Sequence, residues 1–418
     1  MTAYDAGASR TAIPLSATVI LVATLGSIYM VSQFLRNSIG VIAPDLALEL
    51  SMNASEIGLL SSTFFFSFAA AQIPLGIALD RYGPRRCMLV CSVIAVLGSV
   101  MFALSASSPA LIAARALMGL GSSCYLMAPL ALYAARYAPD RFSMLVGIQL
   151  GLGSTGTLIA TAPLALSAAA IGWRATFAVV AAVVTIAALL VAVVVREGRE
   201  PHHDHNETLR ESIAGIVDAL RTPSILQLFL MQLSAYSSFV LIVGLWGGPY
   251  LTHIYGYDLR ARGEILFLAA AGQIAGSFVL GPLDRVFGNY KTPVFIGAGL
   301  TAISLAVPAI AGVMPPAAMI ACFAGVGFFS AYTSVLIAHG KSLFPQRLVG
   351  RGLTLLNMGT MGGVFLTQTA SGVVIDLFPA VNGTYPLQAY RLVFAMQVGF
   401  LLLACLAYLT ARDPRRQG

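Results

Sequence analysis

Long runs of apolar residues, almost free of charge, fill this chain from residue 14 to residue 411. Of its 418 residues, 58% are hydrophobic and only 10% are charged, and the mean hydropathy is +0.84. Soluble domains of any size are far less apolar than this, so lipid is the solvent in which the chain folds. We therefore expect an all-α polytopic membrane protein.

The apolar runs divide into segments of the length that crosses a membrane. A hydrocarbon core of about 30 Å takes roughly 20 helical residues to span. We predict twelve transmembrane helices, at residues 14–42, 55–79, 86–106, 109–134, 143–168, 174–196, 223–250, 260–283, 291–313, 315–340, 349–376 and 390–411.

The second half of the chain repeats features of the first. An Asp-Arg pair at residues 80–81 recurs at 284–285, an offset of 204 residues. Three further matches keep an offset of 206 residues: 139–141 with 345–347, Gly153 with Gly359, and Gly156 with Gly362. The chain is therefore a duplicated membrane unit, which is typical of a transporter.

The positions of Lys and Arg predict the orientation. If the N-terminus is cytosolic, 18 of the 24 Lys and Arg residues fall on the cytosolic side, where positive charge collects. Both termini should then be cytosolic, and the net charge of +7 reflects topology rather than nucleic-acid binding. Residues 1–13 are polar and run straight into the first span, so we expect no cleaved signal peptide.

The longest polar stretch separates the two repeats. It predicts a cytosolic tail at 1–13, a six-helix bundle at 14–196, a linker at 197–222, a second six-helix bundle at 223–411 and a tail at 412–418. Within the linker, Thr208 and Glu211 fit a capping box that begins a short amphipathic helix on the cytosolic surface.

We expect neither a metal nor a cofactor. The linker residues His202, His203 and His205 have metal-binding side chains, but a solvated polar loop is the simpler interpretation of them. The five cysteines lie in or beside apolar spans, where they act as small hydrophobic residues, and they predict no disulfide or zinc framework.

A turn between spans two and three carries the clearest motif. In the sequence GIALDRYGPRR, a Gly lets helices pack, an Asp ends the span, and a second Gly turns the chain into a basic cluster. We expect the Asp to hold the cytosolic side shut through contacts that opening must break. The predicted gating residues are Gly76, Asp80, Arg81, Gly83 and Arg85, with Asp284 and Arg285 in the second copy.

This motif and its degenerate copy resemble the loop signature of the major facilitator superfamily. The sequence RALMGLG at 115–121 resembles the second motif of that family. The resemblance covers residues 14–411, and it implies two pseudo-symmetric six-helix bundles around a central cavity lined mainly by spans 1, 4, 7 and 10. It also implies secondary transport by alternating access.

Two arginines lie inside predicted spans. Arg36 is six residues from the end of span one, and Arg115 is six residues from the start of span four, so we place both about 9 Å below the outer helix ends. An embedded Arg costs at least about 2.5 kcal/mol, and no mid-span carboxylate neutralises either. The pair predicts an anion site. Alternatively, Arg36 snorkels outward or pairs with Glu56, and Arg115 is structural.

The stretch from Arg36 to Pro44, followed by residues 58–61 and 72–76, resembles the anion:cation symporter and organophosphate antiporter branches of the family. In those branches the span-one Arg contacts the anionic group of the substrate. This chain departs from them at Leu35 and Ser122, where many members have acids, and in a span seven without Arg. Sugar phosphates are thereby disfavoured, as is the nitrate and nitrite branch, because span two also lacks an Arg.

Several neutral polar residues fall on the predicted cavity spans. Each either bonds substrate or joins neighbouring helices. The candidates for substrate binding, besides Arg36 and Arg115, are Tyr29, Gln33, Tyr125, Gln232, Tyr236 and Tyr332. We expect structural roles for Gln149, Asn357 and Gln368, and a packing role rather than a proton relay for His339.

The sequence thus predicts a multi-pass transporter of the cell inner membrane, and no enzyme, since no nucleophile with a base appears in the spans. Its expected substrate is a small organic anion, a carboxylate, bound near Arg36 and moved by symport. The coupling ion is left open between a proton and Na+. The alternative is an exporter of amphipathic compounds or drugs by proton antiport, which the lack of a Gly-Pro pair in span five disfavours.

Overall fold

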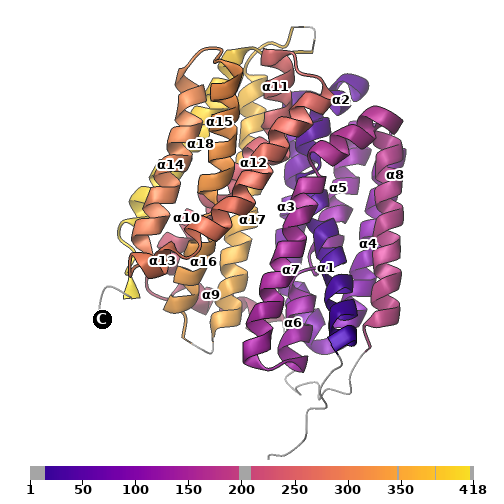
Figure 1. The fold of residues 1–418 in the computed structure, drawn as a ribbon, viewed down its shortest axis with the longest axis vertical. Helices are drawn as coiled ribbons and strands as arrows, with labels where there is room; N and C mark the ends of the chain where they lie inside the picture. Colours follow the sequence, from indigo (N-terminus) through magenta and orange to yellow (C-terminus); the bar gives the residue numbers. More distant parts are fainter. Residues whose placement is uncertain (1–14, 197–208, 346–347, 382, 415–418) are drawn as a thin grey trace, which may run out of the picture.

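A computed structural model of the chain describes residues 15–196, 209–345, 348–381 and 383–414. Figure 1 shows long helices side by side in two groups, one from each half of the chain. Ten helical segments in these ranges are long and apolar enough to cross a membrane. Two less apolar helices, α7 and α17, complete the twelve spans. The all-helical, twelve-span fold expected from the sequence is confirmed.

The first bundle contains spans one to six. Its helices are α1 (Leu15–Asn37) and α2 (Ile39–Leu50), α3 (Ala54–Tyr82), α4 (Pro84–Leu104), α5 (Ser108–Ser122) and α6 (Met127–Arg136), α7 (Pro139–Ile159) and α8 (Ala162–Val194). Within α8, Gly172 has a φ of 80°, so the chain turns there from span five into span six.

The second bundle follows the linker. Its helices are α10 (Ile225–Leu241), the π-helix η1 (Ile242–Trp246) and α11 (Gly247–Tyr255), α12 (Leu259–Leu280) and α13 (Leu283–Val286), α14 (Lys291–Ile310), α15 (Pro316–Ser330) and α16 (Thr333–Leu343), α17 (Val349–Asp376) and α18 (Leu387–Tyr408).

Spans one, four, seven and ten are each built from more than one helical segment. Span one breaks at Ser38, span four between Ser122 and Met127, span seven at η1, and span ten between Ser330 and Thr333. Broken helices in a membrane protein occur where the backbone is buried in protein or lines a cavity. Span five, between Ile159 and Ala162, and span eight, between Leu280 and Leu283, are also broken, so the breaks are not confined to the spans that the resemblance placed around the cavity.

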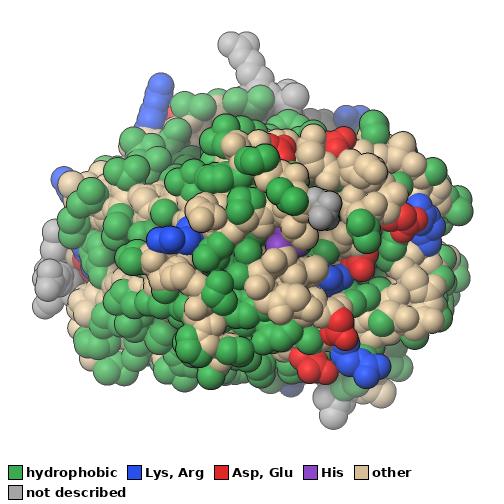
Figure 2. Space-filling view, turned by 90° about the horizontal axis from the view of Figure 1, so that it is seen from above, with side chains coloured by type: hydrophobic (Ala, Val, Ile, Leu, Met, Phe, Trp, Pro, Cys, Tyr) green, Lys and Arg blue, Asp and Glu red, His purple; other side chains and the backbone are tan. Residues whose placement is uncertain are grey.

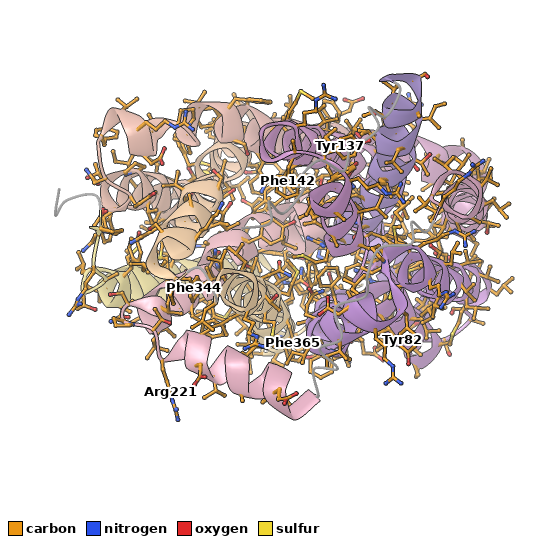
Figure 3. The ribbon with its side chains drawn as sticks, turned by 90° about the horizontal axis from the view of Figure 1, so that it is seen from below. Tyr82, Tyr137, Phe142, Arg221, Phe344 and Phe365 are labelled. Atoms are coloured by element: carbon orange, nitrogen blue, oxygen red, sulfur yellow. The ribbon has the colours of Figure 1, made fainter. Side chains whose placement is uncertain are left out.

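The two ends of the molecule differ in charge. We call the end that carries Arg81, Arg85 and Lys291 the basic end, and the end that carries Asp45, Glu49 and Asp376 the acidic end. The amphipathic linker helix is present as α9 (Leu209–Leu220), and it packs against α3 and α17. Figure 3, seen from the basic end, shows α9 lengthwise along one edge of the molecule, with Arg221 pointing away. Thr208, the expected cap, lies outside the described residues.

The bundles are packed tightly together at the acidic end. A Cβ added to Gly248 would lie 1.9 Å from the carbonyl oxygen of Gly40, and one added to Gly40 would lie 2.1 Å from that of Val243. Only glycine permits backbones to approach this closely. The larger buried apolar cluster accordingly runs through both bundles here, from Ile42 to Trp246.

The basic end is arranged differently. The second apolar cluster, which includes Tyr332 and Leu356, is built from the second bundle and α9. A Cβ added to Gly76 would meet no atom within 4 Å, so the helix packing expected at this glycine is not seen in this conformation. The interface is therefore closed at the acidic end.

Span one is longer than predicted. The expected end at residue 42 precedes Pro44, but the helix continues through that proline to Leu50. Proline is tolerated in membrane helices because neighbouring groups satisfy the carbonyls that it frees.

Candidate functional site: a buried arginine between the two bundles

Arg36 is 7% exposed and makes no hydrogen bond or ion pair with any residue that the structure describes. Its Nε atom is fully enclosed without a partner, and its guanidinium carbon lies 4.8 Å from the ring centre of Phe68 on α3. The ring face attracts the cation but does not neutralise it. The alternative pairing of Arg36 with Glu56 is not formed, because Glu56 Oε2 accepts the Asn53 N–H at 3.0 Å in a capping box.

Arg36 lies deeper than predicted. The helical path continues for 14 residues from Arg36 to Leu50, which puts the arginine roughly 20 Å from the acidic end. The predicted depth of about 9 Å is therefore wrong, because it rested on a span that ended at residue 42. The residue sits near the middle of span one, beside the break at Ser38.

Span one and span seven lie side by side at this depth. Tyr29 is within electrostatic range of both Arg36 and Tyr236, and a Cβ on Gly244 would lie 3.6 Å from Asn37 Oδ1. Tyr29 and Tyr236 are 207 residues apart, and so are Asn37 and Gly244. Equivalent positions of the two repeats therefore face each other. The structure thus relates two predicted residues, Tyr29 and Tyr236, across the two bundles, and Tyr29 lies about 10 Å along the helix from Arg36.

The amide side chains near Arg36 have free hydrogen-bonding capacity. The enclosed Oε1 atom of Gln33, one turn before Asn37, has no described partner. Asn37 is wholly buried, and its Nδ2 atom donates to the Gln33 carbonyl at 3.0 Å and to Thr157 Oγ1 at 3.4 Å, while its Oδ1 atom has no described partner. Sequence reasoning missed Asn37, although an amide next to an embedded Arg was a usable signal.

Arg115 is wholly buried, its two described hydrogen-bond partners are backbone carbonyls, and its enclosed Nη2 atom has no described partner. It donates from Nη1 to the carbonyl of Leu35 and from Nε to the carbonyl of Leu60 at 3.4 Å, and it stands 4.6 Å from the ring centre of Phe64. The structural alternative for this residue therefore fits the geometry better than direct substrate contact. Its bond to Leu35 fixes the backbone immediately before Arg36.

The other predicted residues lie away from Arg36. Tyr125 is wholly buried and donates to Ser92 Oγ at 3.0 Å inside the first bundle. Tyr332 packs on Gly297 inside the second bundle, with no described partner for its hydroxyl. Gln232 is wholly buried one turn before Tyr236, and its Oε1 atom accepts from Thr360 at 3.2 Å. With the 207-residue offset between the facing spans, Gln232 lies level with residue 25 of span one. That level is eleven helical residues, or about 16 Å, from Arg36.

Two of the expected structural residues have structural partners. Gln149 donates to the carbonyl of Leu25 at 2.8 Å and accepts from Tyr133 at 3.0 Å. His339 pairs with Tyr408 Oη at 2.6 Å and with the carbonyl of Arg412 at 2.8 Å. Gln368 differs from them, because neither side-chain amide atom of this buried residue has a described partner.

The gating motif forms the turn that the sequence predicts. Gly83 has a φ of 81°, and Arg85 donates to the carbonyl of Ala192 at 2.8 Å at the end of α8. In the second copy the turn falls at Gly288, with a φ of 63°, and Asp284 is buried while Arg285 is exposed. Asp80 and Arg81 are exposed at the basic end. Their role in gating stays a prediction.

The acidic end carries cross-bundle polar contacts that the sequence did not reveal. Arg262 of α12 pairs with Asp45 of α2, whose partner was not predicted. Asp376 of α17 accepts the N–H groups of Ala54 at 3.0 Å and Ser55 at 2.7 Å, so it caps α3 of the other bundle. Figure 2 shows acidic, basic and histidine side chains among apolar ones on this face.

A tyrosine in the loop after α17 supports this cap. Tyr385 donates from its hydroxyl to Asp376 at 2.7 Å and accepts the N–H of Ala54 at 3.0 Å. Burial, reinforced by the hydrogen bond to Asp376, raises the pKa of Tyr385 to about 12. The hydroxyl therefore remains a donor at neutral pH.

No group of His, Cys, Asp and Glu side chains within the described ranges could hold a metal ion. The linker histidines at 202, 203 and 205 lie outside those ranges. All five cysteines are free.

Two six-helix bundles, with broken spans and a buried cation where they meet, define a membrane transport protein rather than an enzyme. The chain belongs to the Major Facilitator Superfamily, whose family model matches residues 25–263 and 228–418. The structure is similar to that of a bacterial homologue of the human lysosomal transporter Spinster in an inward-facing, unoccupied conformation, with a TM-score of 0.77 and 18% identity over 95% of this chain and 97% of that one.

Curated relatives match with low identity. A probable sulfoacetate transporter of Cupriavidus necator is 29% identical over 42% of this chain and 40% of its own length. A hexuronate transporter of Bacillus subtilis is 22% identical over 86% of this chain and 88% of its own length. A chloramphenicol resistance protein of Streptomyces lividans is 27% identical over 65% of this chain and 67% of its own length.

Proposed function

We propose that this chain carries a small organic anion across the inner membrane by alternating access, and that Arg36 binds the anionic group. The main support for this proposal is that Arg36 is only 7% exposed and that its guanidinium has no described anionic partner. A buried charge without a counter-ion is costly, and a bound carboxylate or sulfonate would remove that cost. Charge-assisted bonds from a planar guanidinium suit these groups.

The neighbours of Arg36 suit a substrate with polar groups as well as a charge. Tyr29 and Tyr236 come from opposite bundles, and Gln33 and Asn37 offer amide oxygens without described partners. A substrate held by both bundles can bind differently in the two states, which is what alternating access requires. Arg115 acts here as a positioning residue through Leu35.

The relatives support the anionic class. Sulfoacetate carries a sulfonate and a carboxylate, and hexuronates carry a carboxylate beside hydroxyls, so both are small organic anions. The environment of the Arg36 cation and the substrates of these relatives agree. We place both termini in the cytosol, from the basic excess at that end, so that the acidic end faces outward.

Uptake into proteoliposomes tests the proposal, with sulfoacetate and glucuronate as probe anions. Arg36→Ala should lower uptake of the transported anion at least about 30-fold, because a lost charged contact costs at least about 2 kcal/mol. Arg36→Lys keeps the positive charge but loses the planar guanidinium that can bind an anion through two hydrogen bonds, so it should retain partial uptake. Arg260→Ala removes an exposed arginine at the acidic end and is the matched control. Wild-type uptake by a folded Arg36→Ala protein would refute the anion site.

The drug exporter remains the second candidate, because one relative is a chloramphenicol resistance protein. A thermal-shift screen separates the two. Stabilisation by chloramphenicol and amphipathic cations alone, unchanged in Arg36→Ala, would favour export. Stabilisation by small carboxylates or sulfonates that disappears in Arg36→Ala favours the anion carrier.

A further inference from the structure

A cavity lies at the acidic end, separate from Arg36. Its volume is about 610 Å³, which is in the range of small-molecule sites. Its walls come from both bundles: α2, the start of α3, Trp246, α11, α12, and residues 380 and 383–385 of the loop after α17. Leu48 in its wall is 81% exposed, so the cavity opens to the surface. We call it the vestibule.

The vestibule is about 13 Å farther toward the acidic end than Arg36, because Asp45 in its wall follows Arg36 by nine helical residues. Between them lie the close backbone contacts of Gly40 with Val243 and Gly248. The vestibule and Arg36 are therefore on opposite sides of the closed part of the interface.

One buried hydrogen-bond donor in the vestibule wall is unused. Arg262 is 3% exposed, and its Nη atoms are committed to Asp45 and, at 2.9 Å, to Thr252 Oγ1. Its enclosed Nε atom has no described partner. Asp45 and Arg262 neutralise each other. The hydrogen-bonding group that remains available in this pair is therefore the Nε–H donor of Arg262.

A second donor follows from the bonding of His253. Its Nδ1 atom lies 3.4 Å from the backbone nitrogen of Tyr385 and 2.6 Å from Tyr390 Oη. A backbone N–H can only donate, so Nδ1 is an acceptor and the proton of the neutral ring is on Nε2. Nε2 makes no hydrogen bond with the described residues. His253 is within electrostatic range of Arg262, so the two donors are near each other.

The rest of the wall is largely apolar. Met52, Ile57, Trp246 and Pro249 line it beside these donors. Unused donors at one place and apolar walls elsewhere suit a ligand with an acceptor-rich head and a short carbon skeleton.

We infer that the vestibule is a second binding site for small organic anions, in which Arg262 and His253 hold a carboxylate or sulfonate while the acidic end is closed. The inference rests on the proposed function for the role of this site as a holding position ahead of Arg36. An anion there contacts groups of both bundles, so its occupancy favours the closed acidic end.

Tryptophan fluorescence gives a local readout. The chain has two tryptophans, and Trp173→Phe leaves Trp246, in the vestibule wall, as the sole emitter. Full-length protein carrying Trp173→Phe and Arg36→Ala is titrated with sulfoacetate and with glucuronate. A saturable change in emission is expected, since the vestibule does not need Arg36. Adding His253→Leu should weaken the apparent affinity about tenfold.

Two further variants keep the test decisive if His253→Leu does not fold. Thr384 is exposed in the vestibule wall, and Thr384→Glu should weaken binding about tenfold by repulsion, while Thr384→Gln should not. No saturable change with either anion, equal affinity in the Glu and Gln variants, or an equal response to neutral glucose would overturn the inference. These readings involve no transport, so they are independent of the uptake result for Arg36→Ala.

Discussion

The two halves of the bundle interface are built from different contacts. At the acidic end, Gly40 and Gly248 bring backbones together, and Asp45 pairs with Arg262 from the other bundle. At the basic end, a Cβ added to Gly76 would meet no atom within 4 Å, and α9 packs against α3 and α17. The closed half is thus held by contacts of fixed geometry, whereas the other half has space for contacts that belong to a different state.

Forcing apart the backbones that meet at Gly40 and Gly248 should have the largest effect on the difference between the closed acidic end and the basic end. A side chain in place of Gly248 would clash with the Gly40 carbonyl, so Gly248→Val should favour opening of the acidic end and lower uptake by about 100-fold. Spin labels at Leu48 and Arg260, in protein whose native cysteines are replaced, should report a longer distance. Gly299→Val, at a position in α14 where an added Cβ meets no atom within 4 Å, is the matched control and should leave that distance unchanged; equal distances in both variants would contradict the comparison.

Removing one partner of the cross-bundle ion pair should have a smaller effect. Asp45→Asn leaves the buried Arg262 without its counter-ion, which should shift the population toward an open acidic end by about tenfold or more. The same spin-label distance measures it. Glu49→Gln breaks a pair with Arg174 inside one bundle, so it should not move the distance.

Removal of the α3 cap should come next. Asp376→Asn weakens the acceptor for the Ala54 and Ser55 N–H groups, and a cap is worth about 1 kcal/mol. The thermal midpoint of the closed protein should fall by a few degrees. Thr384→Gln, in the neighbouring loop, serves as the control. A midpoint that does not change in Asp376→Asn would show that the cap adds nothing to this end.

The smallest effect near neutral pH should come from Tyr385. Its pKa is raised from 10.0 to about 12 in the folded protein, so its stabilising contribution is complete below about pH 10 and is lost as the pH rises through about 12. Chemical unfolding of wild-type protein between pH 8 and pH 11.5 should show this decline, and Tyr385→Phe should lack it. The same decline in both proteins would assign it to other groups.

The sequence predicted the spans, the duplication and the family because these depend on hydrophobicity and spacing along the chain. It also identified Arg36, since an embedded cation is visible without a structure. It could not tell which face of a span meets the other bundle, because these helices are apolar all round. Tyr125 and Tyr332 were therefore placed in a cavity although they pack inside their own bundles.

Other features depend on contacts between distant parts of the chain. The pair of Arg262 and Asp45 was not predicted, because the two residues are 217 positions apart in the chain. The predicted depth of Arg36 was wrong because the first span was ended at residue 42, whereas the helical path continues through Pro44 to Leu50.

The π-helix η1 sets the rotation of everything that follows it in span seven. Its last turn closes with a bond from the Gly247 N–H to the Ile242 carbonyl, five residues back, so the turn contains one residue more than an α-helical turn. If that turn were wound as an α-helix with all of its residues kept, α11 would rotate by about 100° relative to its present setting. His253 and Tyr250 would then face different neighbours while α10 kept its own. The one extra residue in the π turn therefore sets which way the side chains of α11 face, independently of the orientation of α10.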